Sequence, residues 1–73
     1  MRHTLTAIIE REDDGYVALC PQLDIASQGT TVDEARANLQ EALELFFESA
    51  PEDEVRSRLS GEMYVTQLEI AVG

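Results

Sequence analysis

Acidic side chains are the residues of this chain best suited to chemistry, because clustered carboxylates can bind a divalent metal or act as an acid and base pair. Their spacing favours another interpretation. Asp13 and Asp14 fall in a turn, and residues 52–54 stand where the start of a helix favours acids. We therefore expect solvated carboxylates, with no metal or other cofactor. A third acidic group follows the outer face of a predicted helix: Glu34, Glu41, Glu44 and Glu48.

A thiol and an imidazole could form a nucleophile and its base, and the chain has one of each, Cys20 and His3. The alternation of the predicted strands places His3 on the core-facing side of the first strand and Cys20 on the opposite side of the second. One cysteine and one histidine are also too few for an internal disulfide or a structural zinc site. We expect a structural cysteine and a protein that is not an enzyme.

The stretch SQGTTVDEARANL, residues 27–39, has a glycine and two threonines entering a helix, which is a pattern that can bind phosphate. The hydroxyl of Thr31 can instead accept from the backbone at Glu34, and Glu34 can reach back to Thr31, forming a capping box. Asp33 and Glu34 would repel a phosphate, and the chain has no lysine to compensate. The stretch therefore predicts a helix start, with Gly29 permitting the turn out of the preceding strand.

Length and composition indicate a single domain, residues 1–73, with a small core. A chain this short buries only about 60 % of its unfolded surface, so we expect a homo-oligomer, most simply a dimer. The hydrophobic fraction is 44 %, and no apolar run approaches the roughly 18 residues of a membrane span. The N-terminus lacks the apolar core of a secretory signal, and together with the single thiol this predicts a cytoplasmic protein without a membrane association.

The charge balance restricts the partners that the chain can bind. Fifteen acids and five bases give a formal net charge of −10. Direct binding to nucleic acid is disfavoured, because phosphate affinity depends on basic residues. A basic protein would instead be attracted.

Alternating apolar and polar residues predict a β-hairpin at the N-terminus, with strands at residues 3–10 and 16–20. A three-residue loop with Gly15 in the left-handed conformation would pair Ile9 with Leu19. This register keeps Val17 with Ile9 and Leu19 on the core face. The opposite face would then carry residues apolar enough to be covered by a second chain, namely Ile8, Tyr16, Ala18 and Cys20.

The rest of the chain predicts a third strand, a long helix and a final strand. Pro21 ends the second strand, and a short strand over residues 24–28 stops at Gly29. Apolar residues from Val32 to Phe47 fall in one helical arc, and Leu45 lies outside it and is a candidate contact between chains. Pro51 ends this helix, a short second helix follows, and residues 63–72 alternate like a strand. The fold class is α+β, two-layer, with three to four antiparallel strands in the order β-β-β-α-β.

The stretch from Asp14 to Ser49 resembles the N-terminal domain of the HicB antitoxins, a family of small bacterial and archaeal proteins. The resemblance depends on the order and spacing of the matching residues, since each is weak alone. The preceding strand also fits. The structural positions of the match include Gly15, Pro21, Gly29, Thr31, Glu34 and Ala35.

The resemblance implies a three-stranded antiparallel sheet, a helix packed on it and a further strand. It also implies a role, because HicB proteins neutralise HicA toxins, which are small basic ribonucleases that cleave mRNA. Longer members continue into a domain that binds DNA. We expect a short form without that domain, so DNA binding is not carried over.

An acidic hairpin could form the surface that binds such a toxin. Glu12, Asp13 and Asp14 lie at its tip, and Tyr16 adds an aromatic ring beside them. The alternative is a stand-alone homo-oligomeric relative that has no toxin and serves as a structural or small-ligand module. A nuclease using Asp13 and Asp14 is a third hypothesis, which predicts cleavage dependent on Mg²⁺ or Mn²⁺.

Overall fold

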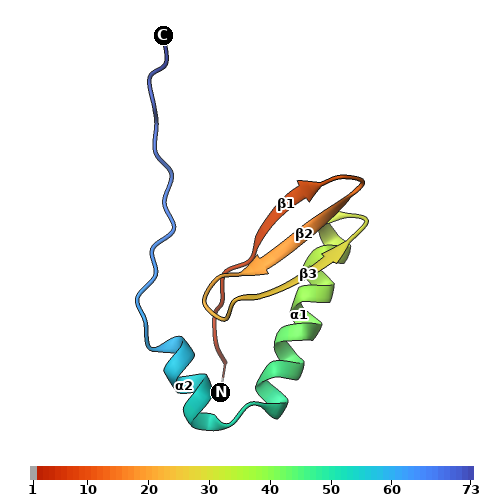
Figure 1. The fold of residues 1–73 in the computed structure, drawn as a ribbon, viewed down its shortest axis with the longest axis vertical. Coiled ribbons are helices and arrows are strands. Elements are labelled where there is room, and N and C mark those ends of the chain that lie inside the picture. Colours follow the sequence, from red (N-terminus) through yellow and green to blue (C-terminus); the bar gives the residue numbers. More distant parts are fainter. Residues whose placement is uncertain (1) are drawn as a thin grey trace.

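The computed structural model describes residues 2–73 as a sheet of three antiparallel strands with a long helix on one face (Figure 1). The strand order is β1-β2-β3, so β1 and β3 are the two edges. The α+β fold expected from the sequence is confirmed, with three strands in the sheet. The elements are β1 (Ile8–Glu12), β2 (Gly15–Cys20), β3 (Ile25–Gly29), α1 (Val32–Ser49) and α2 (Glu52–Leu59).

The turn between β1 and β2 has two residues, so the predicted three-residue loop is wrong. Glu12 lies opposite Gly15, and Ile9 lies opposite Ala18 instead of Leu19. Asp13 takes the positive φ, at 53°, while Gly15 stays in the strand. A short polar side chain such as Asp tolerates this conformation, which is why the glycine was not needed for it.

This register reverses the two faces that the sequence predicted for β2, whereas Ile9 of β1 stays on the core face as predicted. Ala18 and Cys20 are fully buried beneath α1, whereas Val17 and Leu19 lie on the opposite face. The expectation that a second chain covers Ala18 and Cys20 is therefore wrong, because a one-residue shift moves every side chain to the other face. The face without a helix carries Ile8, Val17, Leu19 and Ala26.

The core lies between the sheet and α1 and is small. Helix α1 contributes Ala35 and Leu39, and the turn after β2 contributes Leu23, which is 1 % exposed. Val32 was predicted to join this apolar arc, but it is 44 % exposed at the first position of α1. The fully buried residues are Ala18, Cys20, Leu23, Ala35 and Leu39.

Helix α1 begins at the cap that the sequence predicts, with one change. The Oγ1 atom of Thr31 accepts a hydrogen bond from the backbone N–H of Glu34 at 3.0 Å. The Glu34 carboxylate accepts from the backbone N–H of Thr30 at 2.8 Å, one residue before the expected partner, Thr31. Two backbone N–H groups at this end, those of Thr30 and Glu34, thus have side-chain partners, much as in a capping box.

Gly29 allows β3 and the first turn of α1 to approach closely. A Cβ atom at this position would lie 2.5 Å from the backbone nitrogen of Ala35. Its φ is not positive, so the close approach, and not the predicted turn, requires the glycine. The close contact between β3 and α1 is also stabilised by Asn38, whose Nδ2 atom donates to the carbonyl oxygen of Gln28 at 2.8 Å.

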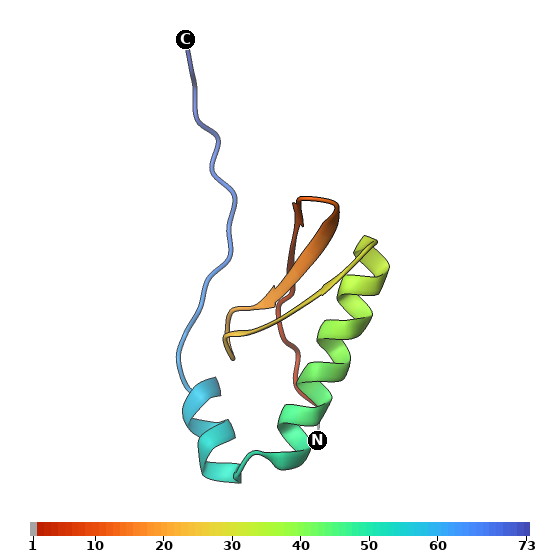
Figure 2. The ribbon, with the colours of Figure 1, turned by 45° about the vertical axis from the view of Figure 1, so that its right-hand side comes forward.

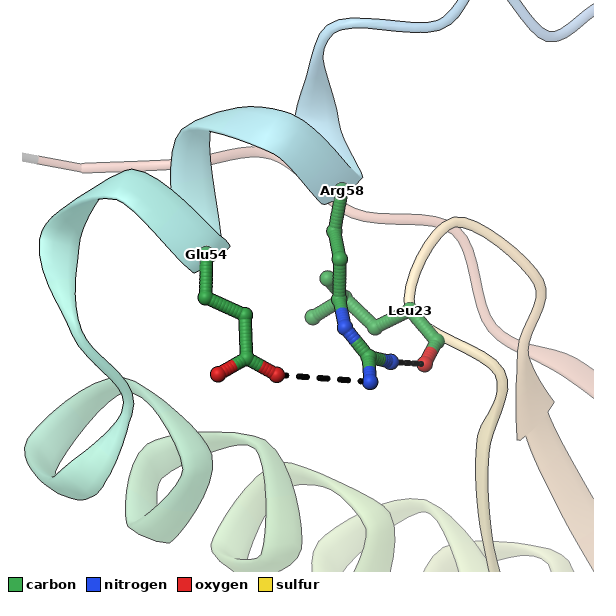
Figure 3. A network of polar contacts seen from close by, with 3 residues as sticks. All are labelled: Leu23, Glu54 and Arg58. Carbon is green, nitrogen blue, oxygen red and sulfur yellow. Dashed lines mark hydrogen bonds and ion pairs between the residues drawn. The ribbon is translucent and has the colours of Figure 1, made fainter.

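Helix α2, which the sequence predicts, is held against the turn between β2 and β3 by Arg58 (Figure 3). The Nη1 atom of Arg58 donates to the carbonyl oxygen of Leu23 at 2.8 Å, and Nη2 lies 3.4 Å from the Glu54 carboxylate. The guanidinium also lies over the ring of Phe46 in α1, 5.5 Å from its centroid. The side chain of Arg58 therefore holds α2 in place and, with it, the point from which the C-terminal segment continues.

The segment after α2 is extended but pairs with no strand of the described chain, so the predicted final strand, residues 63–72, is wrong for a single copy. It runs away from the sheet and α1, and its end lies far from both (Figures 1 and 2). Its apolar side chains are exposed: Tyr64, Val65, Leu68, Ile70 and Val72 are between 64 and 92 % exposed.

Candidate functional site

The hairpin turn, the end of β3 and the start of α1 meet at one end of the molecule. The antiparallel pairing of β2 and β3 places Tyr16 opposite Gly29, so the β1-β2 turn and the end of β3 lie side by side. A connection of two residues joins β3 to α1, so the helix begins at the same end. This arrangement forms a shallow groove of about 510 Å³, which we call the hairpin groove.

Carboxylates dominate the hairpin groove. Residues from the turn, Glu12, Asp13 and Asp14, line it together with Glu34 of α1, and no arginine is among its lining residues. Asp13 and Asp14 are exposed to solvent, and Glu34 is held by the cap of α1. This end of the molecule therefore presents negative charge to any approaching partner.

Tyr16 lies in the same groove but is less available than the sequence suggested. Its side chain is half-buried, and its hydroxyl oxygen accepts from Nη1 of Arg11 at 3.2 Å. The Arg11 guanidinium also lies 5.5 Å from the ring centroid. A partner that stacks on this ring would have to displace Arg11 or pack beside it.

Leu45 does not share this groove. It is 57 % exposed near the end of α1, eleven residues beyond Glu34, which corresponds to about 16 Å along a helix. The sequence correctly placed it outside the apolar arc. The structure thus brings four of the five predicted contact residues together and leaves Leu45 apart.

The two residues weighed as a catalytic dyad have separate structural partners. His3 stacks on Phe47 of α1, with 5.1 Å between ring centroids. Cys20 is buried and its thiol lies 3.5 Å from Oε1 of Gln22, which in turn is hydrogen-bonded to Thr6. Within residues 2–73, no group of three or more His, Cys, Asp or Glu side chains is arranged to hold a metal ion.

A second and larger groove, of about 1180 Å³, runs between the N-terminal segment and α1. Its apolar lining includes Leu5, Leu39, Leu43 and Phe47, and Arg36 and Glu44 of α1 add charge. We call it the N-terminal groove. This groove was not predicted, because it arises where α1 packs mainly on β3 and β2 and leaves the β1 side uncovered.

None of the helices in the described part of the chain combines the length and apolar character needed to cross a membrane.

Comparison with known proteins relates the chain to small proteins of one family. A UPF0150 protein of Synechocystis sp. is 49 % identical over 55 residues, which cover 73 % of this chain and 76 % of the relative. A UPF0150 protein of Helicobacter pylori is 34 % identical over 68 residues, or 92 % of this chain and 94 % of the relative. A second UPF0150 protein of Synechocystis sp. is 47 % identical over 49 residues, or 64 % of this chain and 62 % of the relative.

No family model and no solved structure matches the chain. The match to the Helicobacter pylori protein nevertheless spans almost the whole of both chains, so it includes the hairpin, the sheet and both helices. On this similarity, the chain belongs to the UPF0150 family.

Proposed function

We propose that this protein is a HicB-like antitoxin, a non-enzymatic dimer that binds a small basic HicA-type ribonuclease and covers its active surface. The observation that carries the proposal is the acidic end of the molecule, where three elements bring Glu12, Asp13, Asp14 and Glu34 around one groove. A ribonuclease that binds mRNA must present basic residues to phosphate, and an acidic surface is complementary to them.

The residues that carry the resemblance to HicB proteins support the fold of the partner-binding domain. Gly29, Ala35 and Asn38 join β3 to α1, and Thr31 and Glu34 begin the helix. These residues have a structural role at the start of the helix. We therefore assign partner binding to the exposed acids of the neighbouring turn, Glu12, Asp13 and Asp14. The net charge of −10 adds long-range attraction to a basic partner.

Calorimetric titration of the purified chain with a HicA-type ribonuclease encoded beside it tests the proposal. We expect a defined complex whose affinity falls as salt rises, because exposed charges are screened over about 8 Å at 0.15 M ionic strength. Neutralising the hairpin with Glu12→Gln, Asp13→Asn and Asp14→Asn should weaken binding about tenfold or more, since close charge pairs across an interface couple strongly.

A matched triple variant controls for the overall change in charge. Glu41→Gln, Asp24→Asn and Asp53→Asn remove the same three charges elsewhere on the surface, and Asp24 has a positive φ of 55°, comparable to that of Asp13. We expect this variant to bind nearly as tightly as the natural chain. Equal losses in both variants would exclude the hairpin as the contact surface, and no complex with any such ribonuclease at low salt would refute the antitoxin role.

A further inference from the structure

The C-terminal segment, residues 61–73, is the part of the molecule that the fold of one chain does not explain. It makes no hydrogen bond to the rest of the described chain, and a Cβ atom at Gly61 would meet nothing within 4 Å. Its apolar side chains include Tyr64, Leu68 and Ile70, each at least 74 % exposed. Isolated exposed apolar residues are common, but a continuous row of them marks an interaction surface.

The dimensions of the chain lead to the same conclusion. The accessible surface is 6164 Å², whereas a compact protein of 8.1 kDa exposes about 4,500 Å². The radius of gyration is 14.5 Å, compared with about 11 Å for a compact domain of 73 residues. The excess of roughly 1,700 Å² per chain is large enough for a stable dimer, whose two partners together commonly bury 1,200–2,000 Å².

The same chain offers a place that such a segment fits. Strand β1 is an edge of the sheet, so its outer backbone groups have no strand partner within residues 2–73. The N-terminal groove continues from the start of that edge, between the segment that precedes β1 and helix α1. A strand added to the β1 edge and continued alongside this segment would direct every second side chain toward the groove and the intervening ones toward the opposite face.

We infer that two copies exchange their C-terminal segments, so that residues 63–72 of each copy pair with the β1 edge of the other and fill its N-terminal groove. The alternation of the segment fits this placement. One set of side chains is mostly apolar and would face Leu39, Leu43 and Phe47, while Gln67 and Glu69 belong to the set on the opposite face. The groove-facing set is Tyr64, Thr66, Leu68, Ile70 and Val72.

Charge also favours this segment as the point of contact between copies. Two chains of net charge −10 repel one another, so a contact is favoured where acids are few. Residues 63–72 carry a single charge, that of Glu69, which the alternation directs away from the groove. The exchange gives each sheet a fourth strand, at the position along the chain where the sequence predicts one.

The test compares two neighbouring substitutions in the full chain, Leu68→Asp and Gln67→Asp. Light scattering across a dilution series should give a mass of about twice 8.1 kDa for the natural chain and for Gln67→Asp. Leu68→Asp should raise the dimer dissociation constant at least about 100-fold, because it places a charge against the apolar side chains of Leu39, Leu43 and Phe47. Circular dichroism should show the same helix content in all three chains.

Nuclear magnetic resonance on a mixture of isotopically labelled and unlabelled chains identifies the contact itself. Nuclear Overhauser effects between Ile70 of one copy and Leu43 of the other would support the exchange, as would slow amide exchange in residues 63–72. A dimer unaffected by Leu68→Asp would overturn the inference. A monomeric natural chain would also overturn it. This holds whether the amide hydrogens of residues 63–72 exchange rapidly with solvent or are protected because the segment pairs with the sheet of its own chain. Each of these results can be obtained without any ribonuclease and is thus separate from the test of the antitoxin role.

Discussion

The residues that define the helix start act through close packing. Gly29 brings the backbone of β3 against the first turn of α1, and Ala35 is fully buried at that contact. Gly15 lies beside them, since a Cβ there would be 2.8 Å from the carbonyl oxygen of Gly29. The sequence predicted the cap at Thr31 correctly and the partner of Glu34 to within one residue, because capping depends on neighbours in the chain. It misassigned Gly15 and Gly29, because close approach depends on elements that meet only in the fold.

Replacing Gly29 by Ala should destabilise the domain. The added Cβ would lie within 3 Å of backbone atoms of Glu34 and Ala35, which cannot move aside as a flexible side chain would. We expect a loss of about 1–3 kcal/mol in the free energy of unfolding, as for other overpacked sites, measured by urea denaturation. Gly61→Ala is the matched control, because a Cβ there meets nothing within 4 Å, and it should change stability by less than about 0.5 kcal/mol. Equal effects of the two substitutions would contradict this account of Gly29.

At the scale of elements, the hairpin shows where sequence patterns reach their limit. Both strands of the hairpin were predicted, because alternation is a local signal, but the first was expected over residues 3–10 and is Ile8–Glu12. The loop length was wrong by one residue, since both faces of β2 are apolar and the pattern alone did not select the buried one. The hydrogen bond from the Arg58 side chain to the carbonyl oxygen of Leu23 was not predictable either, because the two residues lie 35 positions apart in the chain.

Removal of the Arg58 side chain should loosen α2. The variant Arg58→Ala loses a hydrogen bond from a charged donor, worth about 1.5–3 kcal/mol, and the contact with Phe46. Its ion pair with Glu54 is nearly half exposed and adds little. We expect amide exchange in Glu52–Leu59 to become about tenfold faster or more.

Arg56→Ala is the control for that substitution. Arg56 also pairs with an acid four residues earlier, Glu52 at 3.8 Å, but its side chain is 71 % exposed. Its removal should leave the exchange rates of α2 nearly unchanged. Similar acceleration in both variants would indicate that helix charge, and not the contact with Leu23, holds α2 in place.

At the scale of the whole molecule, two surfaces with different properties lie apart from each other. The acidic hairpin groove is formed by the turn, β3 and α1, whereas the C-terminal segment is apolar and leaves the domain from α2. The charge of the chain, readable from its composition, anticipated the first surface. The second could not be anticipated, because the alternation of residues 63–72 predicts a strand but does not reveal which chain supplies its partner.

The proposed antitoxin role is tested by RNA cleavage by any HicA-type ribonuclease encoded beside this protein, measured with increasing amounts of the protein. Cleavage should stop near a stoichiometric amount of the natural chain. The Glu12→Gln, Asp13→Asn, Asp14→Asn variant should require about tenfold more protein, as expected from the loss of close charge pairs. Full ribonuclease activity in the presence of excess natural chain at low salt would refute the antitoxin role.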